Sequence, residues 1–255
     1  MGSNIKLSGV VITLNEEDNI SRCIDSLKQV TEDIIVVDSF STDRTEEICL
    51  EKGVRFVKHQ YESGIAQVTW AVKQAKYDHI LFLDADEEMS MELKESVLKV
   101  KENWTSAGYS LRFRTLFCDK WLIHSWRHRV TRLFDRTRVE VAGREPHYNF
   151  FPMKGQKITN LKGDVLHYAY YNVEDFVAKL NSYSTRSAEA SFKQGKKAPF
   201  YKLWLNPFWN FFRNYILLAG FLDGTHGLTV CAINSHYIFL KYAKLRTIIK
   251  RQITI

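Results

Sequence analysis

The chain of 255 residues contains four cysteines, and none of them forms a Cys-x-x-Cys pair or stands at zinc-finger spacing from a histidine. This pattern excludes a disulfide framework and a cysteine-based zinc site as expectations, and it is typical of a reducing compartment, so we expect a cytoplasmic protein. The start of the chain has no basic-then-apolar leader. No apolar run approaches the roughly 20 residues that a membrane-spanning helix needs.

Two glycine-rich signatures of phosphate binding are also missing. The sequence contains neither G-x-G-x-x-G nor G-x-x-x-x-G-K-[ST], which excludes the common dinucleotide fingerprint and the Walker loop. The hydrophobic fraction of 45% and the aromatic fraction of 13% are nevertheless high enough for a sizeable core. Length and composition therefore predict one large domain, or a domain with an appendage.

Charge is unevenly distributed along the chain, whose net charge is +7. Through residue 100, acids outnumber lysine plus arginine by 19 to 11, whereas after it these bases outnumber acids by 25 to 10. The C-terminal segment has these bases and no acid among them: Lys241, Lys244, Arg246, Lys250 and Arg251. Such a tail suits an anionic membrane surface or nucleic acid, and a solvated basic face is the plain alternative.

The first hundred residues alternate between strand and helix patterns. Short apolar runs typical of buried strands occur at residues 8–14, 33–38, 54–58 and 79–84. Segments with apolar residues at helical spacing separate these runs. The alternation predicts an α/β fold, with a doubly wound, mainly parallel sheet of the nucleotide-binding type flanked by helices.

An acidic cluster follows the fourth of these apolar runs, in the segment ILFLDADEE. In an extended segment Asp84 and Asp86 point the same way, so both can face one cation. Carboxylates this close repel one another unless a metal or hydrogen-bond donors neutralise them. The alternative is an acidic loop in which Glu87 and Glu88 favour the dipole of a following helix. We expect the metal site, at the sheet edge where α/β proteins bind ligands.

Three segments, in this order and spacing, resemble the family 2 glycosyltransferases with the GT-A fold: TLNEEDNISRCIDSL, IIVVDSFSTDRTEEI and ILFLDADEE. Four later segments resemble the branch that holds the lipopolysaccharide-core β-glucosyltransferases: RLFDR, LKGDVLHYAYYN, KLNSYSTRSA and NYILLAGFLDGTHGL. The resemblance covers nearly the whole chain. It implies a catalytic domain at residues 1–170 that transfers a hexose such as glucose, with inversion, from a UDP-sugar or other nucleoside diphosphate sugar to a lipopolysaccharide-core or other cell-surface glycan acceptor.

The resemblance also implies roles for individual residues. Asp38 would hydrogen-bond the nucleotide base, and Asp84 would contact the ribose. Asp86 would ligate Mg2+ or Mn2+ with His167 as a further ligand, although a histidine between aromatic residues can equally be structural. Arg132 would contact the diphosphate, or would only pair with Asp135 and Glu140. The segment after the first strand would flank the base and ribose through Thr13, Asn15 and Glu16, and Glu16 could equally be a first-turn helix acid.

The general base is the point at which this sequence departs from the family. An inverting transferase needs a group that accepts the proton of the acceptor hydroxyl. Family members usually place His-Glu or His-Asp shortly after Arg-Leu-Phe, whereas this chain has Tyr148 where the acid is expected. A phenol with a pKa near ~10 is a poor base at neutral pH. The catalytic candidates are therefore Glu145, which we prefer, and His147.

The last part of the chain, residues 171–255, is expected to be a helical extension. Asn172 is a candidate N-cap for its first helix, and Asn206-Pro207 is expected to start a helix rich in aromatic residues. An amphipathic aromatic helix beside a basic tail fits a position on a membrane surface. The alternative is a helix packed against the sheet domain.

Two other functional classes compete with the transferase. A sugar-phosphate nucleotidyltransferase would have a glycine-rich basic loop after the first strand, and this chain has Asn15-Glu16-Glu17-Asp18 there. A non-catalytic basic binding module would leave the acidic cluster unexplained. We therefore expect a nucleotide sugar and a glycan or lipid-linked acceptor as partners, and no nucleic acid.

Overall fold

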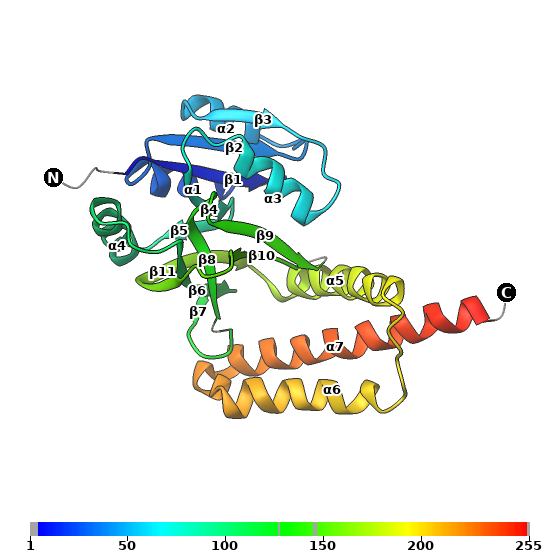
Figure 1. Cartoon of the computed structure of the whole chain (residues 1–255). Coiled ribbons are helices and arrows are strands. Elements are labelled where there is room, and N and C mark those ends of the chain that lie inside the picture. Colours follow the sequence, from blue (N-terminus) through cyan, green and yellow to red (C-terminus); the bar gives the residue numbers. More distant parts are fainter. Residues whose placement is uncertain (1–4, 127, 145–146, 254–255) are drawn as a thin grey trace. The chain divides into compact units, whose positions relative to one another are not determined.

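The computed structural model describes residues 5–126, 128–144 and 147–253 (Figure 1). They divide into two compact units. The first holds the described residues of Met1–Arg114 and His128–Tyr168, and the second holds those of Thr115–Arg127 and Ala169–Ile255. The expectation of a catalytic domain over residues 1–170 and an extension over residues 171–255 remains a prediction.

Four strands of the main sheet run parallel to one another, as the strand and helix patterns predict. Its strands are β1 (Leu7–Thr13), β2 (Asp33–Asp38), β3 (Arg55–Lys58) and β4 (His79–Asp84), in the order β3-β2-β1-β4. The connecting helices are α1 (Ile20–Lys28), α2 (Thr45–Glu51) and α3 (Gly64–Lys73). The parallel pairing places Thr13 opposite Asp38 and Ile12 opposite Asp84. The predicted α/β fold, with a parallel sheet flanked by helices, is confirmed.

Antiparallel strands extend this sheet beyond β4. They are β5 (Glu87–Met89), β6 (Gly108–Phe117), β7 (Lys120–Leu122), β8 (His128–Asp135) and β11 (Ile158–Tyr170), and the path continues as β4-β8-β6-β11-β5 with β7 on β6. The helix α4 (Met91–Glu102) follows β5, and β9 (Val139–Arg144) pairs with β10 (His147–Pro152) in a separate hairpin. The pairing of β5 with β11 joins the acidic segment to a strand far along the chain.

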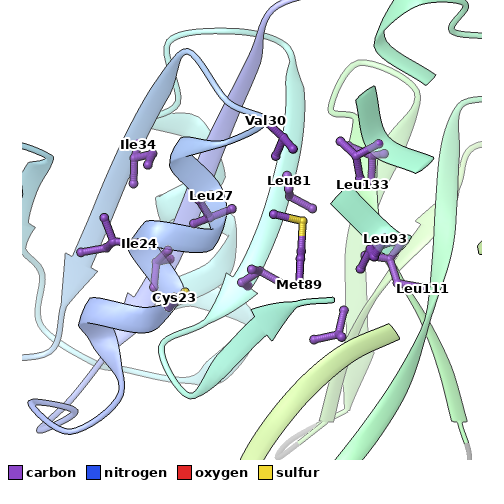
Figure 2. Close-up of a cluster of buried hydrophobic side chains, with 14 of the residues drawn as sticks. Cys23, Ile24, Leu27, Val30, Ile34, Leu81, Met89, Leu93, Leu111 and Leu133 are labelled. Carbon is purple, nitrogen blue, oxygen red and sulfur yellow. The ribbon is translucent and has the colours of Figure 1, made fainter. Parts of the chain in front are cut away.

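The core of the first unit lies between the sheet and its helices. Figure 2 shows Cys23, Ile24 and Leu27 of α1 in one apolar cluster with Leu81 of β4 and Met89 of β5. All five side chains are buried, and full burial of a leucine or isoleucine contributes about 1.5–3 kcal/mol each. The buried residues of α1, including Cys23, recur at helical spacing and so form one face of the helix.

The second unit is mostly helical. It contains α5 (Val173–Lys193), α6 (Lys202–Phe211), a π-helical turn η1 (Phe212–Leu217), a short 3-10 helix η2 (Gly220–Asp223) and α7 (Gly224–Ile253). Asn172 caps α5 as predicted, because its side chain accepts a hydrogen bond from the backbone N–H of Asp175 at 2.7 Å. Among the described residues, no single helix is long and apolar enough to cross a membrane. The bent pair Lys202–Leu217 and Gly220–Gln252 meets that test by length and composition alone.

The expected start of a helix at Asn206-Pro207 is wrong. The helix α6 begins at Lys202 and contains Pro207 in its interior. A proline there removes one backbone hydrogen bond and is unfavourable by roughly 3 kcal/mol. The packing of α6 along α7 continues upstream of the proline, where the ring of Trp204 lies 6.5 Å from that of Phe239. Contacts with α7 lie on both sides of Pro207, at Lys202 with Tyr242 and at Asn210 with Ser235, so the proline does not mark the start of the helix.

Candidate active site

The carboxyl ends of β1, β2 and β4 form one edge of the parallel sheet, and three predicted site residues lie there. Thr13 ends β1, Asp38 ends β2 and Asp84 ends β4. The register places Thr13 beside Asp38, and it places Asp84 beside Ile12 of the central strand. This is the edge at which open α/β sheets bind ligands. The structure thus brings these three residues together as predicted.

Asp38 is fully buried, and its carboxylate organises the turn that follows β2. The backbone N–H of Ser41 donates to its Oδ2 at 2.8 Å, and the hydroxyl of Ser41 donates to its Oδ1. Asn15, held at a φ of 54°, ties the loop after β1 to the same turn, because its N–H donates to Ser41 Oγ and its Oδ1 accepts from Thr42 N–H, both at 2.8 Å. Each oxygen of Asp38 retains a further lone pair.

The side chains of Thr13 and Glu16 differ in their hydrogen bonding at this edge of the sheet. The hydroxyl oxygen of Thr13 is buried and has no hydrogen-bond partner among the described residues. A buried polar atom of this kind is unfavourable unless a bound molecule satisfies it. Glu16 instead accepts from the side-chain amide of Asn19 at 2.8 Å, next to the start of α1. Glu16 therefore lies before the N-cap of α1 and is not an acid of its first turn, and its role beside the nucleotide stays a prediction.

Asp84 is held by two donors from strands far along the chain. Arg132 of β8 donates from Nη2 to its Oδ2 at 2.9 Å, and Tyr148 of β10 donates from its hydroxyl to its Oδ1 at 3.0 Å. The same Nη2 lies 3.3 Å from Oε1 of Glu87. Arg132 thus pairs with acids, but its partners are Asp84 and Glu87, and the expected pairing with Asp135 and Glu140 is wrong. Burial alone would lower the pKa of Arg132, but Glu87 and Asp84 raise it above its ordinary value.

The remaining nitrogens of Arg132 are a further feature of this cluster. Arg132 is 7% exposed, and its Nε and Nη1 atoms are buried without a hydrogen-bond partner among the described residues. Its guanidinium carbon lies 5.0 Å from the ring centre of Phe82 and 5.5 Å from that of Phe113. Aromatic faces attract such a cation, which offsets part of the cost of removing it from water.

Tyr148 is not placed to act as a base. Burial raises the pKa of its hydroxyl well above the ordinary value, and the charge of Asp84 raises it further. The ring packs edge-on against Phe82, with ring centres 6.1 Å apart. A partly buried phenol that donates to a carboxylate holds its proton, so Tyr148 positions Asp84 instead of accepting a proton from an acceptor.

Three side chains at the β5–β11 junction could hold a metal ion. One ligand atom from each of Asp86, Glu87 and His167 lies within 4.8 Å of the others. His167 Nε2 is 3.2 Å from Asp86 Oδ2, and the antiparallel register places His167 opposite Glu87. The structure therefore brings together the two predicted metal ligands, which are separated by 81 positions in the sequence.

The donor set fits a divalent cation. Carboxylate oxygens suit Mg2+ and Mn2+, and an imidazole is accepted by Mn2+ and other transition metals. Burial raises the pKa of Glu87 to about 8, against the opposing effect of Arg132. Glu87 already accepts the backbone N–H of Asp84 at 3.0 Å as well as the Arg132 contact. Asp86 and His167, which are more exposed than Glu87, are therefore the better ligand candidates.

The preferred base, Glu145, lies outside the described residues. For His147 the structure describes the backbone, which is in β10 opposite Arg144 of β9. The next residue of β10 is Tyr148. The choice between Glu145 and His147 therefore remains a prediction from the sequence.

The sequence did not reveal two sets of contacts near the site, those of Glu87 and those of Tyr168. Glu87 was weighed as a helix-start acid, but it lies in β5 and joins Arg132 and the metal-ligand group. Tyr168 of β11 donates from its hydroxyl to Glu88 at 3.1 Å, and the Arg22 guanidinium lies 3.6 Å from the ring centre of Tyr168. No local signal could find these contacts, because the partners come from segments far apart in the sequence.

Comparisons with known proteins agree with the resemblance seen in the sequence. A family model described as "Glycosyl transferase family 2" matches residues 8–178. An uncharacterized glycosyltransferase of Rickettsia bellii is 30% identical over 94% of this chain and 86% of its own length. The lipopolysaccharide core biosynthesis glycosyltransferase LpsC of Rhizobium meliloti is 27% identical over 94% of this chain and 92% of its own length.

Among solved structures, the chain is similar to glucosyl-3-phosphoglycerate synthase from Mycobacterium tuberculosis, in complex with Mn2+, UDP and phosphoglyceric acid. The identity is 21%, the TM-score is 0.36, and the match covers 44% of this chain and 43% of the synthase chain. The family match is much broader, since it spans more than half of the chain. On that match and on the Rickettsia relative, the protein belongs to glycosyl transferase family 2 and is a glycosyltransferase.

Proposed function

We propose that this protein is an inverting, metal-dependent glycosyltransferase that moves a hexose such as glucose from a UDP-sugar to a lipopolysaccharide-core or other cell-surface glycan acceptor. The observation that carries the proposal is the convergence of Asp86, Glu87 and His167 beside Asp84, at the carboxyl end of β4. A diphosphate needs positive charge near it, and a cation held by an acid and an imidazole supplies that charge. The acceptor class is proposed from the similarity to LpsC.

The donor nucleotide is assigned to the edge formed by β1, β2 and β4. Asp38, held by Ser41 in a fixed orientation, offers a carboxylate that can accept an N–H of the base. The hydroxyl of Thr13 is buried and lacks a partner among the described residues, and a nucleotide that reached this strand end would supply one. Asn15 holds the two flanking loops together, and Glu16 accepts a hydrogen bond from the side chain of Asn19, the N-cap of α1.

Asp84 is proposed to contact the ribose, and its orientation supports this role. Arg132 and Tyr148 each donate to a different oxygen of Asp84, so the carboxylate cannot rotate freely. A side chain locked by such contacts binds a ligand without a further loss of conformational freedom. Arg132 acts on the donor through Asp84 and Glu87 in this arrangement.

Asp86 and His167 are proposed to hold Mg2+ or Mn2+. When bound there, the ion neutralises the negative charge that develops on the leaving nucleoside diphosphate. Glu87 supports the site by accepting the N–H of Asp84, which fixes the turn between β4 and β5. Glu145 is proposed to take the proton of the acceptor hydroxyl, with His147 as the alternative.

The proposal is tested by calorimetry of UDP binding with and without Mn2+. We expect binding to depend on the ion in the unaltered protein, and the variant Asp86→Asn to lose that dependence and to lower sugar transfer by at least about tenfold. The matched control is Glu88→Gln. Glu88 lies two positions after Asp86 and contacts Tyr168 instead of the proposed metal ligands. Undiminished transfer by Asp86→Asn would show that the metal assignment is wrong. A panel of nucleotide sugars, with hydrolysis as the readout, identifies the donor.

A further inference from the structure

One face of α6 carries large apolar side chains that the second unit leaves exposed. We call this set the aromatic stripe; its members are Tyr201, Trp204, Leu205, Phe208 and Trp209. They recur at the spacing of a single helical face. Phe208 is 68% exposed and Trp204 is 64% exposed, and α6 has no buried residue. Isolated exposed apolar residues are ordinary, but a contiguous set of this size marks an interaction surface.

The opposite side of α6 is covered by the same unit. Ser235 of α7 donates to the side-chain oxygen of Asn210 at 3.3 Å, and Arg246 donates to the backbone oxygen of Ala198 at 3.1 Å, just before α6. Figure 1 shows α6 (yellow to orange) running alongside α7 (orange to red). The helix is therefore anchored on one side, and the aromatic stripe is displayed on another.

The part of the chain that follows Glu189 and contains the aromatic stripe carries exposed charge of one sign. After Glu189 the sequence contains a single acid, Asp223, and that residue is 2% exposed. The same stretch contains ten bases: Lys193, Lys196, Lys197, Lys202, Arg213, Lys241, Lys244, Arg246, Lys250 and Arg251. Lys196 and Lys197 are exposed immediately before α6, and Arg213 is exposed immediately after it. The exposed surface of this part of the chain is therefore apolar and basic, without an exposed acid among its described residues.

We propose that the aromatic stripe of α6 docks on an anionic lipid bilayer, with α6 lying in the plane of the interface and the neighbouring lysines and arginines against the headgroups. Tryptophan and tyrosine favour the boundary between headgroups and acyl chains. Bases near an anionic leaflet are attracted to it, and an apolar helix face enters the acyl boundary to a shallow depth. A lipid bilayer matches both properties of this surface. Its anionic headgroups attract the lysines and arginines, and its acyl boundary accepts the apolar side chains of the stripe.

This surface goes beyond the proposed transferase activity and does not depend on it. All of its residues lie in the second unit, whereas the proposed donor and metal residues lie in the first. Binding to lipid is therefore measurable without a sugar donor, an acceptor or a metal ion. Loss of lipid binding and loss of transfer are separate results.

The first test is flotation of the full chain with vesicles of phosphatidylcholine alone, or with about one third phosphatidylglycerol. We expect binding to the anionic vesicles at low salt and weaker binding as salt rises, because the charge attraction is screened. The variant Leu205→Gln/Phe208→Gln/Trp209→Gln should bind at least about tenfold more weakly. The matched control Leu50→Gln/Met91→Gln/Leu98→Gln changes three exposed apolar side chains of α2 and α4, and it should bind as the unaltered chain does.

The basic residues are tested in the same assay. Lys196→Glu/Lys197→Glu should weaken binding by at least about tenfold, because each base near an anionic surface contributes to the attraction. Lys73→Glu/Lys99→Glu produces the same change of net charge on α3 and α4 and should have a much smaller effect. Circular dichroism confirms that each variant is folded. The proposal is overturned if the unaltered chain stays unbound at low salt, or if the stripe variant binds as tightly as its control.

Brominated lipid gives a second measurement, since it quenches tryptophans that enter the acyl boundary. The chain has six tryptophans, so Trp204→Phe/Trp209→Phe is the comparison. This variant should still bind, because phenylalanine keeps the apolar face, but it should lose most of the quenching. Quenching that persists unchanged would place other tryptophans in the lipid and overturn the assignment. The assignment would also be overturned if sedimentation without vesicles showed a dimer that the stripe variant abolishes, since a second copy would then cover this face.

Discussion

The hydroxyl of Tyr148 donates a hydrogen bond to Oδ1 of Asp84 at 3.0 Å, and this contact joins the hairpin β9–β10 to the end of β4. In the sequence, Tyr148 stands where family members usually have an acid. The replacement removes a candidate base and adds a donor that holds the aspartate proposed to bind ribose. The proton of Tyr148 stays on its oxygen, because burial and the neighbouring carboxylate raise the pKa well above the ordinary value.

The first prediction concerns the base. Glu145→Gln should preserve UDP-sugar affinity and lower turnover by roughly 10²–10⁴-fold, because the amide cannot accept the proton of the acceptor hydroxyl. Tyr148→Phe should lower turnover far less. Steady-state kinetics of both variants at several pH values provide the check. An inactive Tyr148→Phe beside an active Glu145→Gln would contradict the assignment, and activity in both but not in His147→Ala would make the histidine the base.

The second prediction concerns the buried charge of Arg132. Arg132→Ala should lower the free energy of unfolding by about 3–5 kcal/mol, because it leaves the acids Asp84 and Glu87 without their buried partner. The control is Arg129→Ala, since Arg129 is exposed and donates to the backbone oxygens of Ser110 and Leu161. Arg129→Ala should lower the free energy of unfolding by only about 0.5–1.5 kcal/mol. Urea denaturation measures both, and similar losses for the two arginines would argue against the buried pairing.

The third prediction concerns a close approach of two backbones at Gly163 of β11. Gly163 has a φ of +86°, and a Cβ built there would lie 2.2 Å from the backbone nitrogen of Leu93 in α4. Gly155 has a similar φ of +80° and nothing within 4 Å of such an atom. Gly155→Ala should therefore lower the free energy of unfolding by about 1–2 kcal/mol through the backbone conformation alone. Gly163→Ala should lower it by about 1–3 kcal/mol more, because the added Cβ overlaps the backbone of Leu93.

Thermal and urea denaturation of the two glycine variants separate these effects. Equal losses of stability in Gly155→Ala and Gly163→Ala would mean that the backbone at Leu93 moves aside with little loss of free energy. A larger loss at Gly163 would show that β11 and α4 are tightly packed, which bears on the site because His167 lies on the same strand.

The fourth prediction concerns pH and Asp223 in the second unit. Burial raises the pKa of this carboxyl, but donors in the loop before β8 outweigh it and leave the pKa below its ordinary value. The N–H and hydroxyl of Ser125 each donate at 2.7 Å, and the N–H groups of His124 and Ile123 donate at 2.9 and 3.2 Å. The unfolded chain thus takes up a proton before the folded chain does, so the stabilisation is present above about pH 4 and is lost as the pH falls further.

Asp223→Asn should lower the free energy of unfolding by about 1–3 kcal/mol at pH 7, and it should flatten the decline in stability below about pH 4. The control is Asp119→Asn, since Asp119 is highly exposed and contacts His226 at 2.9 Å. Urea denaturation from pH 3 to pH 7 measures the difference. An unchanged acid dependence in Asp223→Asn would show that this carboxylate does not set the acid limit.

The local pattern of the sequence predicted the parallel half of the fold well. Strand and helix periods depend on which face of a segment is buried, and the run before Asp84 is apolar because β4 is covered on both faces. The caps at Ser90 and Asn172 were also predictable, because an N-cap bonds to a backbone N–H three residues later. The start of α6 was not, because the signal at Asn206-Pro207 is local and the helix begins upstream of it, at Lys202.

The sequence by itself therefore determined the alternation of strands and helices, the placement of Asp38 and Asp84 at strand ends with Asp86 in the turn that follows β4, and the family. The tertiary structure alone decided which distant groups meet these acids. Arg132 reaches Asp84 through the pairing of β8 with β4, and His167 reaches Asp86 through the pairing of β11 with β5. The physical reason is that hydrophobic period and capping act within a few residues. Strand pairing, by contrast, joins segments far apart, and its register follows from the burial of the whole core.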